Sequence, residues 1–357
     1  MKKDKIKILF VLPSLRPGGA ERVVSFIASK INRNNFLPTL VILGFKKDAA
    51  YEIPNTNLVF LNQNRTLTAI PALFSLIKKE SPDIVFSSIG QLNALLGCFS
   101  LFFKKTKFVG RAASIFSSFD SHNKNVKKIN LNSFYRFAYQ RLHAVICQSE
   151  DMYNEVQKKM GTKETKMFKI PNPAREDIRF TKNREGSDKL RCVTVGRLSP
   201  EKGHLRVLEA LNSLGIAFQY TIIGSGVEET KIKDLVKHLK LDKHVTYIPF
   251  TKEVDKYLGE NDVFLQGSFS EGFPNALMES CLAGTPVLAF DCPGGTKEIV
   301  QHGINGYLAK DSHDFTKRLH QIASKEWHPN EIRQSVLDKF SADIILNKYE
   351  ELFRKLL

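Results

Sequence analysis

Two consecutive series of short apolar segments constrain the fold of this 357-residue chain more than any other feature of its sequence. Each segment is four to seven residues long, rich in β-branched and aromatic residues, and most are followed by a stretch with helical periodicity. This alternation is typical of a parallel sheet with crossover helices. The first series occupies residues 6–12, 39–43, 58–61, 83–88, 107–110 and 144–148, and the second occupies residues 191–196, 219–224, 245–248, 262–266, 286–290 and 306–309. Because the series starts twice, the sequence predicts an α/β protein with two doubly wound domains that face a cleft.

The predicted boundary between the domains is the polar segment 171–189, which has prolines on both sides of Asn172 and no hydrophobic period. We therefore expect an N-terminal domain in residues 1–170 and a C-terminal domain in residues 190–340. Residues 341–357 are amphipathic with helical periodicity, and we expect a helix that packs across a domain surface. Ligands of such domains bind at the carboxyl ends of the strands, where loops lead into helices.

The sequence argues against several classes of protein. Its longest nearly apolar run, residues 92–103, falls short of the roughly 20 residues needed to cross a bilayer. The apolar run near the N-terminus leads into a Gly-Gly turn, so we expect a strand there and not a signal peptide. Five cysteines without a CxxC pair, nine histidines without HExxH or HxH spacing, and the absence of Asp-x-Asp disfavour a disulfide framework and a metal site. The cysteine usage fits a cytoplasmic protein best.

The net charge of +16 comes entirely from the first half of the chain. Residues 1–180 contain 29 Lys and Arg against 13 Asp and Glu, whereas residues 181–357 contain 24 of each. Within the first half, residues 99–141 carry nine basic residues against one acid, interleaved with aromatic residues. This combination suits an anionic membrane surface or a lipid diphosphate, because each Lys or Arg near an anionic leaflet contributes about 1 kcal/mol. The alternatives are a solvated basic face without a partner and a nucleic-acid surface.

Two loops that follow predicted strands carry residue types suited to a phosphate. The loop after the first strand contains Gly18 and Gly19 directly before a helix, where paired glycines let backbone amides approach an anion. A tight structural turn explains these glycines equally well. The loop after the seventh predicted strand, GRLSPEKGH, places Arg197 and Lys202 five residues apart around a turn. Both cations suit a diphosphate, and both also suit ion pairs on a surface.

Residues 269–299 form the segment with the most specific pattern. Glu271 lies in the loop after a predicted strand, and Pro274 favours the first turn of a helix. Glu279 follows eight residues after Glu271, about one turn into that helix. The alternatives are that Glu271 only complements the helix dipole and that Glu279 lies on a solvated helix face. The first amides of the helix are expected to be unpaired donors that attract an anion, and they belong to Asn275, Ala276 and Leu277.

The ordered motifs GGAE, GRLSPEKG, IIGSG and EGFPNALMES resemble those of the retaining glycosyltransferases of family 4, over nearly the whole chain. The resemblance implies the GT-B fold, in which a Rossmann-like acceptor domain precedes a Rossmann-like donor domain. Its most specific part is the E-x7-E element, which implies that Glu271 lies by the donor sugar and that Glu279 holds the ribose of the nucleotide. It also implies a reaction without a metal or another cofactor, in which the leaving phosphate oxygen acts as base and Glu271 positions the sugar.

The resemblance also assigns the remaining contacts to the donor. It implies that Arg197 and Lys202 contact the diphosphate and form the catalytic set together with Glu271. Many family members have a histidine in the loop after the strand that matches residues 107–110, but this chain has Arg111 there, and we expect Arg111 to take over that contact with the donor sugar. The donor-binding residues that the resemblance implies are Gly18, Gly19, Gly224, Asn275, Ala276, Leu277 and Glu279.

The sequence thus predicts a glycosyltransferase in the cytoplasm, peripheral on the inner face of the membrane. We expect it to move a hexose or N-acetylhexosamine from a nucleotide diphosphate sugar, with UDP favoured by its frequency in the family, to a lipid-linked glycan in bacterial surface polysaccharide assembly. One alternative is a nucleotide-sugar 2-epimerase with the same fold. Another is a nonenzymatic protein that binds nucleic acid through its basic half; the sequence contains no recognised nucleic-acid module, so no nucleic-acid partner is expected.

Overall fold

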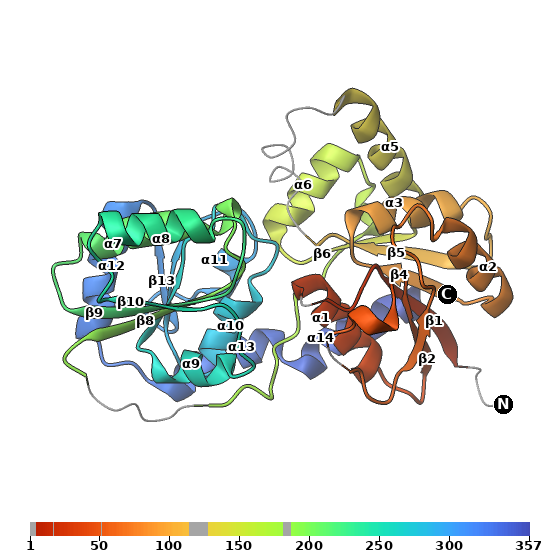
Figure 1. The fold of residues 1–357 in the computed structure, drawn as a ribbon. Helices are drawn as coiled ribbons and strands as arrows, with labels where there is room; N and C mark the ends of the chain where they lie inside the picture. The colour runs from red at the N-terminus through yellow and green to blue at the C-terminus, as the bar shows by residue number, and fades with distance from the viewer. Residues whose placement is uncertain (1–4, 17, 51, 114–127, 181–186) are drawn as a thin grey trace. The chain divides into compact units, whose positions relative to one another are not determined.

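The computed structural model describes residues 5–16, 18–50, 52–113, 128–180 and 187–357. The chain divides into two compact units: unit 1 contains Met1–Pro173 and Asp343–Leu357, and unit 2 contains Ala174–Ala342. Each unit is built on one parallel sheet with helices on both faces (Figure 1). This architecture confirms the predicted α/β class with two doubly wound sheets.

Unit 1 contains a seven-stranded parallel sheet in the order β3-β2-β1-β4-β5-β6-β7. Its strands are β1 (Ile6–Leu12), β2 (Phe36–Ile42), β3 (Asn57–Phe60), β4 (Ile84–Ser87), β5 (Lys107–Arg111), β6 (Ala144–Cys147) and β7 (Met167–Lys169). Its helices are α1 (Gly19–Lys30), α2 (Ile70–Glu80), α3 (Gly90–Phe99), α5 (Lys128–Arg141), α6 (Glu150–Met160) and α14 (Ala342–Lys355), the last beginning at the final residue of unit 2, and two 3-10 turns cover Lys46–Asp48 and Glu164–Lys166. The sequence pattern does not show β7, because three residues are too few to display a period of two.

Alternate residues of the strands in unit 1 face opposite layers of helices. Leu9 and Val11 of β1 pack in one core with buried residues of α2, α3, α5 and α6. Phe10, between them, points to the other face, where its ring lies 6.2 Å from that of Phe353 on α14. Phe353 also contacts the ring of Phe36 on β2, at 6.3 Å. The C-terminal helix is therefore part of the core of unit 1.

Unit 2 contains a six-stranded parallel sheet in the order β10-β9-β8-β11-β12-β13. Its strands are β8 (Leu190–Val195), β9 (Phe218–Ile223), β10 (Val245–Ile248), β11 (Val263–Gln266), β12 (Val287–Phe290) and β13 (Gly306–Ala309). Its helices are α7 (His204–Asn212), α8 (Glu229–His238), α9 (Val254–Glu260), α10 (Asn275–Leu282), α11 (Thr296–Ile299), α12 (Ser312–Ser324) and α13 (Pro329–Phe340), and a 3-10 turn covers Pro200–Lys202. One core lies under α7, α8 and α12 and a second under α9, α10, α11 and α13.

The strand order reverses once in each sheet, between β1 and β4 in unit 1 and between β8 and β11 in unit 2. The loops that leave the carboxyl ends of such neighbouring strands run to opposite faces of the sheet, and the crevice between them is where open α/β sheets bind ligands. The loop after β1 carries Gly18 and Gly19, the loop after β8 carries Arg197 and Lys202, and the loop after β11 carries Glu271. Within the described residues, no helix combines the length and the apolar character needed to span a membrane.

Candidate functional site

An ion pair between Lys202 and Glu271 lies at the strand-order reversal of unit 2. The Lys202 Nζ is 2.7 Å from the Glu271 Oε1, and the two side chains are 29% and 10% exposed. The hydroxyl of Ser268 donates a second hydrogen bond to the same carboxylate oxygen, at 2.6 Å. The structure therefore brings together two of the three residues that the sequence predicts as catalytic, at the carboxyl edge of the sheet, where one of them keeps solvent access.

Two glycines allow the loops that carry this ion pair to touch. Gly203 follows Lys202 with φ of +58°, and a Cβ built there would overlap the carbonyl oxygen of Gly267. A Cβ on Gly267 would in turn overlap the carbonyl oxygen of Gly203. Any other residue at either position would push the loop after β8 away from the loop after β11. The amide of Phe269 also donates to the carbonyl of Glu201, at 2.8 Å, and closes the same contact.

The loop after β12 supports Glu271 from the other side. The amide of Glu271 donates to the carbonyl of Pro293, at 3.0 Å. Gly294 has φ of +120°, and a Cβ built there would overlap the Glu271 carbonyl oxygen. Glu271 is thus held through its backbone as well as its carboxylate, which suits a group that has to present one fixed face to a ligand.

Arg206 on α7 is a site residue that the sequence analysis missed. Its guanidinium lies between the rings of Phe269 and Phe290, at 4.0 and 3.9 Å from the ring centroids. Its Nε donates to the carbonyl of Gly267, at 2.6 Å, and its Nη2 donates to the carbonyl of Ser268. Burial lowers the pKa of Arg206 to about 10, which keeps the group charged at neutral pH. Arg206 therefore holds the loop that carries Glu271 in place. In the sequence, only Phe269, the aromatic residue next to Ser268, indicates this contact.

Arg197 and Gly224 lie in adjacent loops at the same edge. The Arg197 side chain is exposed and has no ion pair with another described residue. Gly224, with φ of +145°, directly follows β9, and a Cβ built there would overlap the carbonyl oxygen of Gly196. The backbone next to Arg197 is therefore packed closely, while its guanidinium is left accessible to a ligand.

Helix α10 begins at Asn275, and its N-cap residue is Pro274, whose side chain makes no capping hydrogen bond. Ala276 and Leu277 follow in that turn. Glu279 lies one turn further along the helix and is buried, with the Arg175 Nη1 3.8 Å from its carboxylate. The solvated helix face weighed for Glu279 is thus wrong. Its role toward a ribose stays a prediction.

The glycines predicted for the N-terminal half lie in unit 1 beside an acid. Gly18 is the residue before α1, and Gly19 is its first residue. A Cβ built on Gly18 would overlap the carboxylate of Glu21, which lies in the first turn of α1. A carboxylate at a helix N-terminus satisfies the helix dipole. An incoming phosphate would have to displace Glu21, and the donor role of both glycines stays a prediction.

Arg111, the last residue of β5, is 2% exposed. Its Nη1 donates to the Ser88 hydroxyl at 2.6 Å, and its Nη2 donates to the side-chain oxygen of Asn172. Burial lowers the pKa of the Arg111 guanidinium, and the neighbouring Tyr349 on α14 opposes that shift. The structure therefore shows Arg111 inside unit 1, bonded to its own unit. Its predicted contact with a donor sugar would require this cluster to open.

Comparisons with known proteins agree with this fold. The family description "Glycosyltransferase Family 4" matches residues 17–177, and "Glycosyl transferases group 1" matches residues 175–336. The amylovoran biosynthesis glycosyltransferase AmsD of Erwinia amylovora is 22% identical over 97% of this chain and 99% of its own. The crystal structure of HepE from Anabaena in complex with UDP-glucose has a TM-score of 0.80 and 19% identity, and the match covers 98% of this chain and all of HepE. The chain is a GT-B glycosyltransferase.

A third relative of this glycosyltransferase is named after a lipid-linked acceptor. It is the N-acetylgalactosamine-N,N'-diacetylbacillosaminyl-diphospho-undecaprenol 4-alpha-N-acetylgalactosaminyltransferase of Campylobacter jejuni, with 24% identity over 82% of this chain and 83% of its own. These comparisons decide for a transferase and against the nucleic-acid-binding protein and the epimerase. Within the part of the chain that the structure describes, no group of three or more His, Cys, Asp or Glu is arranged to hold a metal ion.

The burial of the Arg111 guanidinium leads to a prediction about the stability of this glycosyltransferase. Arg111→Ala should lower the free energy of unfolding by about 2–5 kcal/mol, because it leaves a cavity and removes the buried hydrogen bonds to Ser88 and Asn172. Arg111→Met keeps most of the side-chain volume. The decrease in its free energy of unfolding therefore measures the contribution of the lost hydrogen bonds separately from that of the cavity. Urea unfolding followed by circular dichroism measures both variants. Unchanged unfolding of the alanine variant would contradict the structural role of Arg111.

Proposed function

We propose that the protein is a retaining, metal-independent glycosyltransferase that transfers a hexose or N-acetylhexosamine from a UDP-sugar to a lipid-linked glycan. The observation that carries this proposal is the contact between Lys202 and Glu271, beside the accessible Arg197. A carboxylate and two cations on neighbouring loops at one sheet edge suit a sugar diphosphate, in which a neutral ring adjoins a dianion. The HepE structure with UDP-glucose supports UDP as the nucleotide.

In the proposed reaction, the two cations stabilise the charge that develops on the leaving diphosphate. Arg197 offers a planar fork of donors and Lys202 a point charge, so the pair can bind oxygens on both phosphates. Fixed cations cost no reorganisation as the bond to the sugar breaks, which is why such electrostatic stabilisation is often the largest contribution to catalysis. No metal is required in this scheme.

Glu271 positions both the donor sugar and Lys202. Its Oε1 already accepts hydrogen bonds from Lys202 and Ser268, which leaves Oε2 to accept from a sugar hydroxyl. The acceptor hydroxyl attacks the anomeric carbon on the face from which the diphosphate leaves, and its proton passes to the leaving phosphate oxygen. The glycosidic bond forms as the bond between the sugar and the phosphate breaks, so the anomeric configuration is retained without a covalent enzyme intermediate.

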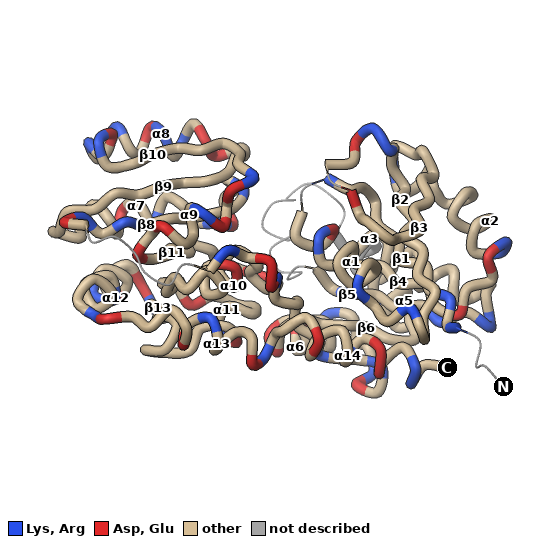
Figure 2. Tube along the Cα trace, turned by 90° about the horizontal axis from the view of Figure 1, so that it is seen from below, with Lys and Arg blue, Asp and Glu red and all other residues tan. Residues whose placement is uncertain are grey.

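The acceptor and the membrane location rest on relatives and on the surface of unit 1. The C. jejuni relative is named for a diphospho-undecaprenol acceptor, and AmsD for amylovoran biosynthesis. Unit 1 carries the excess of basic residues, whose positions along the chain are marked in Figure 2. We therefore assign lipid-linked glycan assembly at the inner face of a bacterial membrane.

Helix α5 offers a surface for that membrane. Phe134 and Phe137 are 47% and 43% exposed, and the Arg141 guanidinium lies 4.7 Å from the ring centroid of Phe137. Arg136 is exposed as well, and the sequence has no Asp or Glu between Asp120 and Glu150. Exposed aromatic rings among cations suit the headgroup region of an anionic bilayer. Residues 114–127 of the predicted basic segment lie outside the described residues.

The donor nucleotide is tested by thermal shift. We expect UDP and UDP-sugars, without added metal, to stabilise the protein more than GDP or ADP do. A ligand at 100 times its Kd should add about 2.7 kcal/mol to the free energy of unfolding. Arg197→Ala should weaken UDP binding, whereas Arg179→Ala, a change at another exposed arginine of unit 2, should not. Equal stabilisation by all three nucleotides would contradict the proposed preference.

The role of Glu271 is tested by turnover. Glu271→Gln should lower the transfer rate about 100-fold or more, in the range that the loss of one fixed polar group at a reacting centre produces. UDP binding should persist, because the proposed diphosphate contacts belong to the cations. UDP release in the presence of acceptor measures the rate, and Glu209→Gln on the exposed face of α7 is the control. Near-normal turnover of Glu271→Gln would sink the assignment.

Membrane association is tested by co-sedimentation with vesicles of phosphatidylglycerol or of phosphatidylcholine. The protein should bind the anionic vesicles, and binding should weaken as salt rises. The double variant Phe134→Ser with Phe137→Ser should reduce binding, and so should Arg136→Glu with Arg141→Glu. Lys237→Glu with Lys252→Glu makes the same charge change in unit 2. If that control reduces binding as much as the α5 charge variant does, then net charge and not this helix accounts for the attraction.

A further inference from the structure

A cavity of about 370 Å³ lies in unit 1, and all the residues that line it belong to that unit. Its walls come from the loops after β1, β2 and β3 and from the first turn of α3. All four segments lie at the carboxyl edge of the sheet of unit 1, where an open α/β sheet binds its ligand. The volume falls within the range of about 300–1,000 Å³ that is usual for small-molecule sites.

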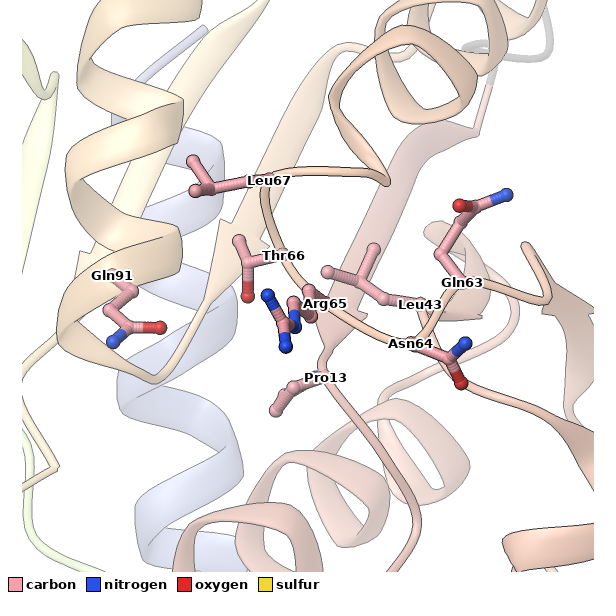
Figure 3. A pocket seen from close by; sticks show the side chains of 8 residues that line it. All are labelled: Pro13, Leu43, Gln63, Asn64, Arg65, Thr66, Leu67 and Gln91. Carbon is pink, nitrogen blue, oxygen red and sulfur yellow. The ribbon is translucent and has the colours of Figure 1, made fainter.

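Polar side chains from two different elements converge on this cavity. Figure 3 shows the Arg65 guanidinium, the Thr66 hydroxyl and the Gln91 amide pointing into the space between the loop after β3 and helix α3. Pro13 and Leu43 form an apolar wall beside them (Figure 3). An apolar wall with a few convergent donors and acceptors is the usual composition of a site that orients a ligand such as a sugar.

The electrostatics of the cavity favour a ligand with negative charge. Arg65 is the one charged residue among the described residues that line it, and it forms no ion pair with another described residue. The first turn of α3 contains no acid, and its N-cap residue Ile89 makes no side-chain capping hydrogen bond, so the positive end of the helix dipole adds to the field of Arg65. Arg65 is exposed, and an anion beside it would gain a charge-assisted hydrogen bond that a neutral sugar cannot make.

We propose that this cavity binds the acceptor through an anionic group on or next to its terminal sugar. Arg65 pairs with the anion, and Thr66 and Gln91 hydrogen-bond to hydroxyls of the ring. The shared chemistry is a carboxylate or phosphate attached to a sugar, which an acidic sugar or the diphosphate of a lipid carrier supplies. This inference rests on the proposed transferase function and adds to it a class of acceptor and the residues that select it.

The test is a ligand-observed NMR titration of the full chain with four probes: glucose, glucuronic acid, glucose 1-phosphate and farnesyl diphosphate. At least one anionic probe should bind ten-fold or more tightly than glucose. Arg65→Gln should reduce that affinity about ten-fold, as expected for the loss of a charge-assisted hydrogen bond. Gln91→Ala should weaken the sugar probes more than farnesyl diphosphate. Arg179→Gln, the same change at an exposed arginine of unit 2, should leave all affinities unchanged.

The four probes distinguish the two possible sources of the anionic group. Preference for glucuronic acid identifies an acidic sugar, and preference for glucose 1-phosphate or farnesyl diphosphate identifies the carrier diphosphate. The proposal is overturned if no anionic probe binds at millimolar concentration, if glucose binds as well as the best anion, or if Arg65→Gln changes nothing while its melting temperature matches the wild type. UDP binding, measured on the same samples, reports on the donor site alone. Failure of UDP to bind would therefore count against the proposed function and not against the cavity.

Discussion

The candidate site depends on one backbone contact, between Gly203 and Gly267. Each of these glycines lies where a side chain would overlap the carbonyl oxygen of the other. The contact joins the loop after β8 to the loop after β11 across the strand-order reversal of unit 2, and only then is Lys202 within 2.7 Å of Glu271. A wider separation of the loops would leave a lysine and a glutamate in solvent, where an ion pair is worth little. The two glycines thus allow Lys202 and Glu271 to form a partly buried ion pair with a fixed orientation.

Two cations near this contact, Lys202 and Arg206, are four residues apart in the sequence but lie in different surroundings. Lys202 lies at the edge with Glu271 and remains partly exposed. Arg206 is enclosed between two aromatic rings, and it donates to the carbonyls of Gly267 and Ser268. The first cation is available to a ligand because the second holds the loop that orients its partner. The sequence shows two basic residues near one turn and does not distinguish these roles, since both depend on what the loop after β11 brings to them.

The sequence predicted the elements whose signal is local and missed the features that depend on tertiary contacts. Each strand of four or more residues overlaps a segment that the pattern predicts, whereas the three-residue β7 has no pattern of its own. The contact between Lys202 and Glu271 depends on two loops that lie at the same edge of the sheet. It could therefore be predicted from the sheet topology that the sequence indicates. The burial of Arg111 could not be predicted in the same way. Its partner Asn172 and its neighbour Tyr349 are 61 and 238 residues distant in the chain, and composition gives no sign that a lone arginine will be enclosed.

The uneven charge of the two halves agrees with the roles proposed for them. Residues 181–357 carry equal numbers of acids and bases, so in unit 2 attraction for a diphosphate has to come from individual cations such as the accessible Arg197. The field of such a group is screened over a Debye length of about 8 Å at physiological salt, which confines it to a ligand that is already in the site. The excess of basic residues in the first half instead sums over a surface, which suits a large anionic partner approached from a distance. The two arrangements of charge suit the proposed soluble donor, which diffuses to a specific contact, and the proposed acceptor, which is embedded in an anionic sheet of lipid.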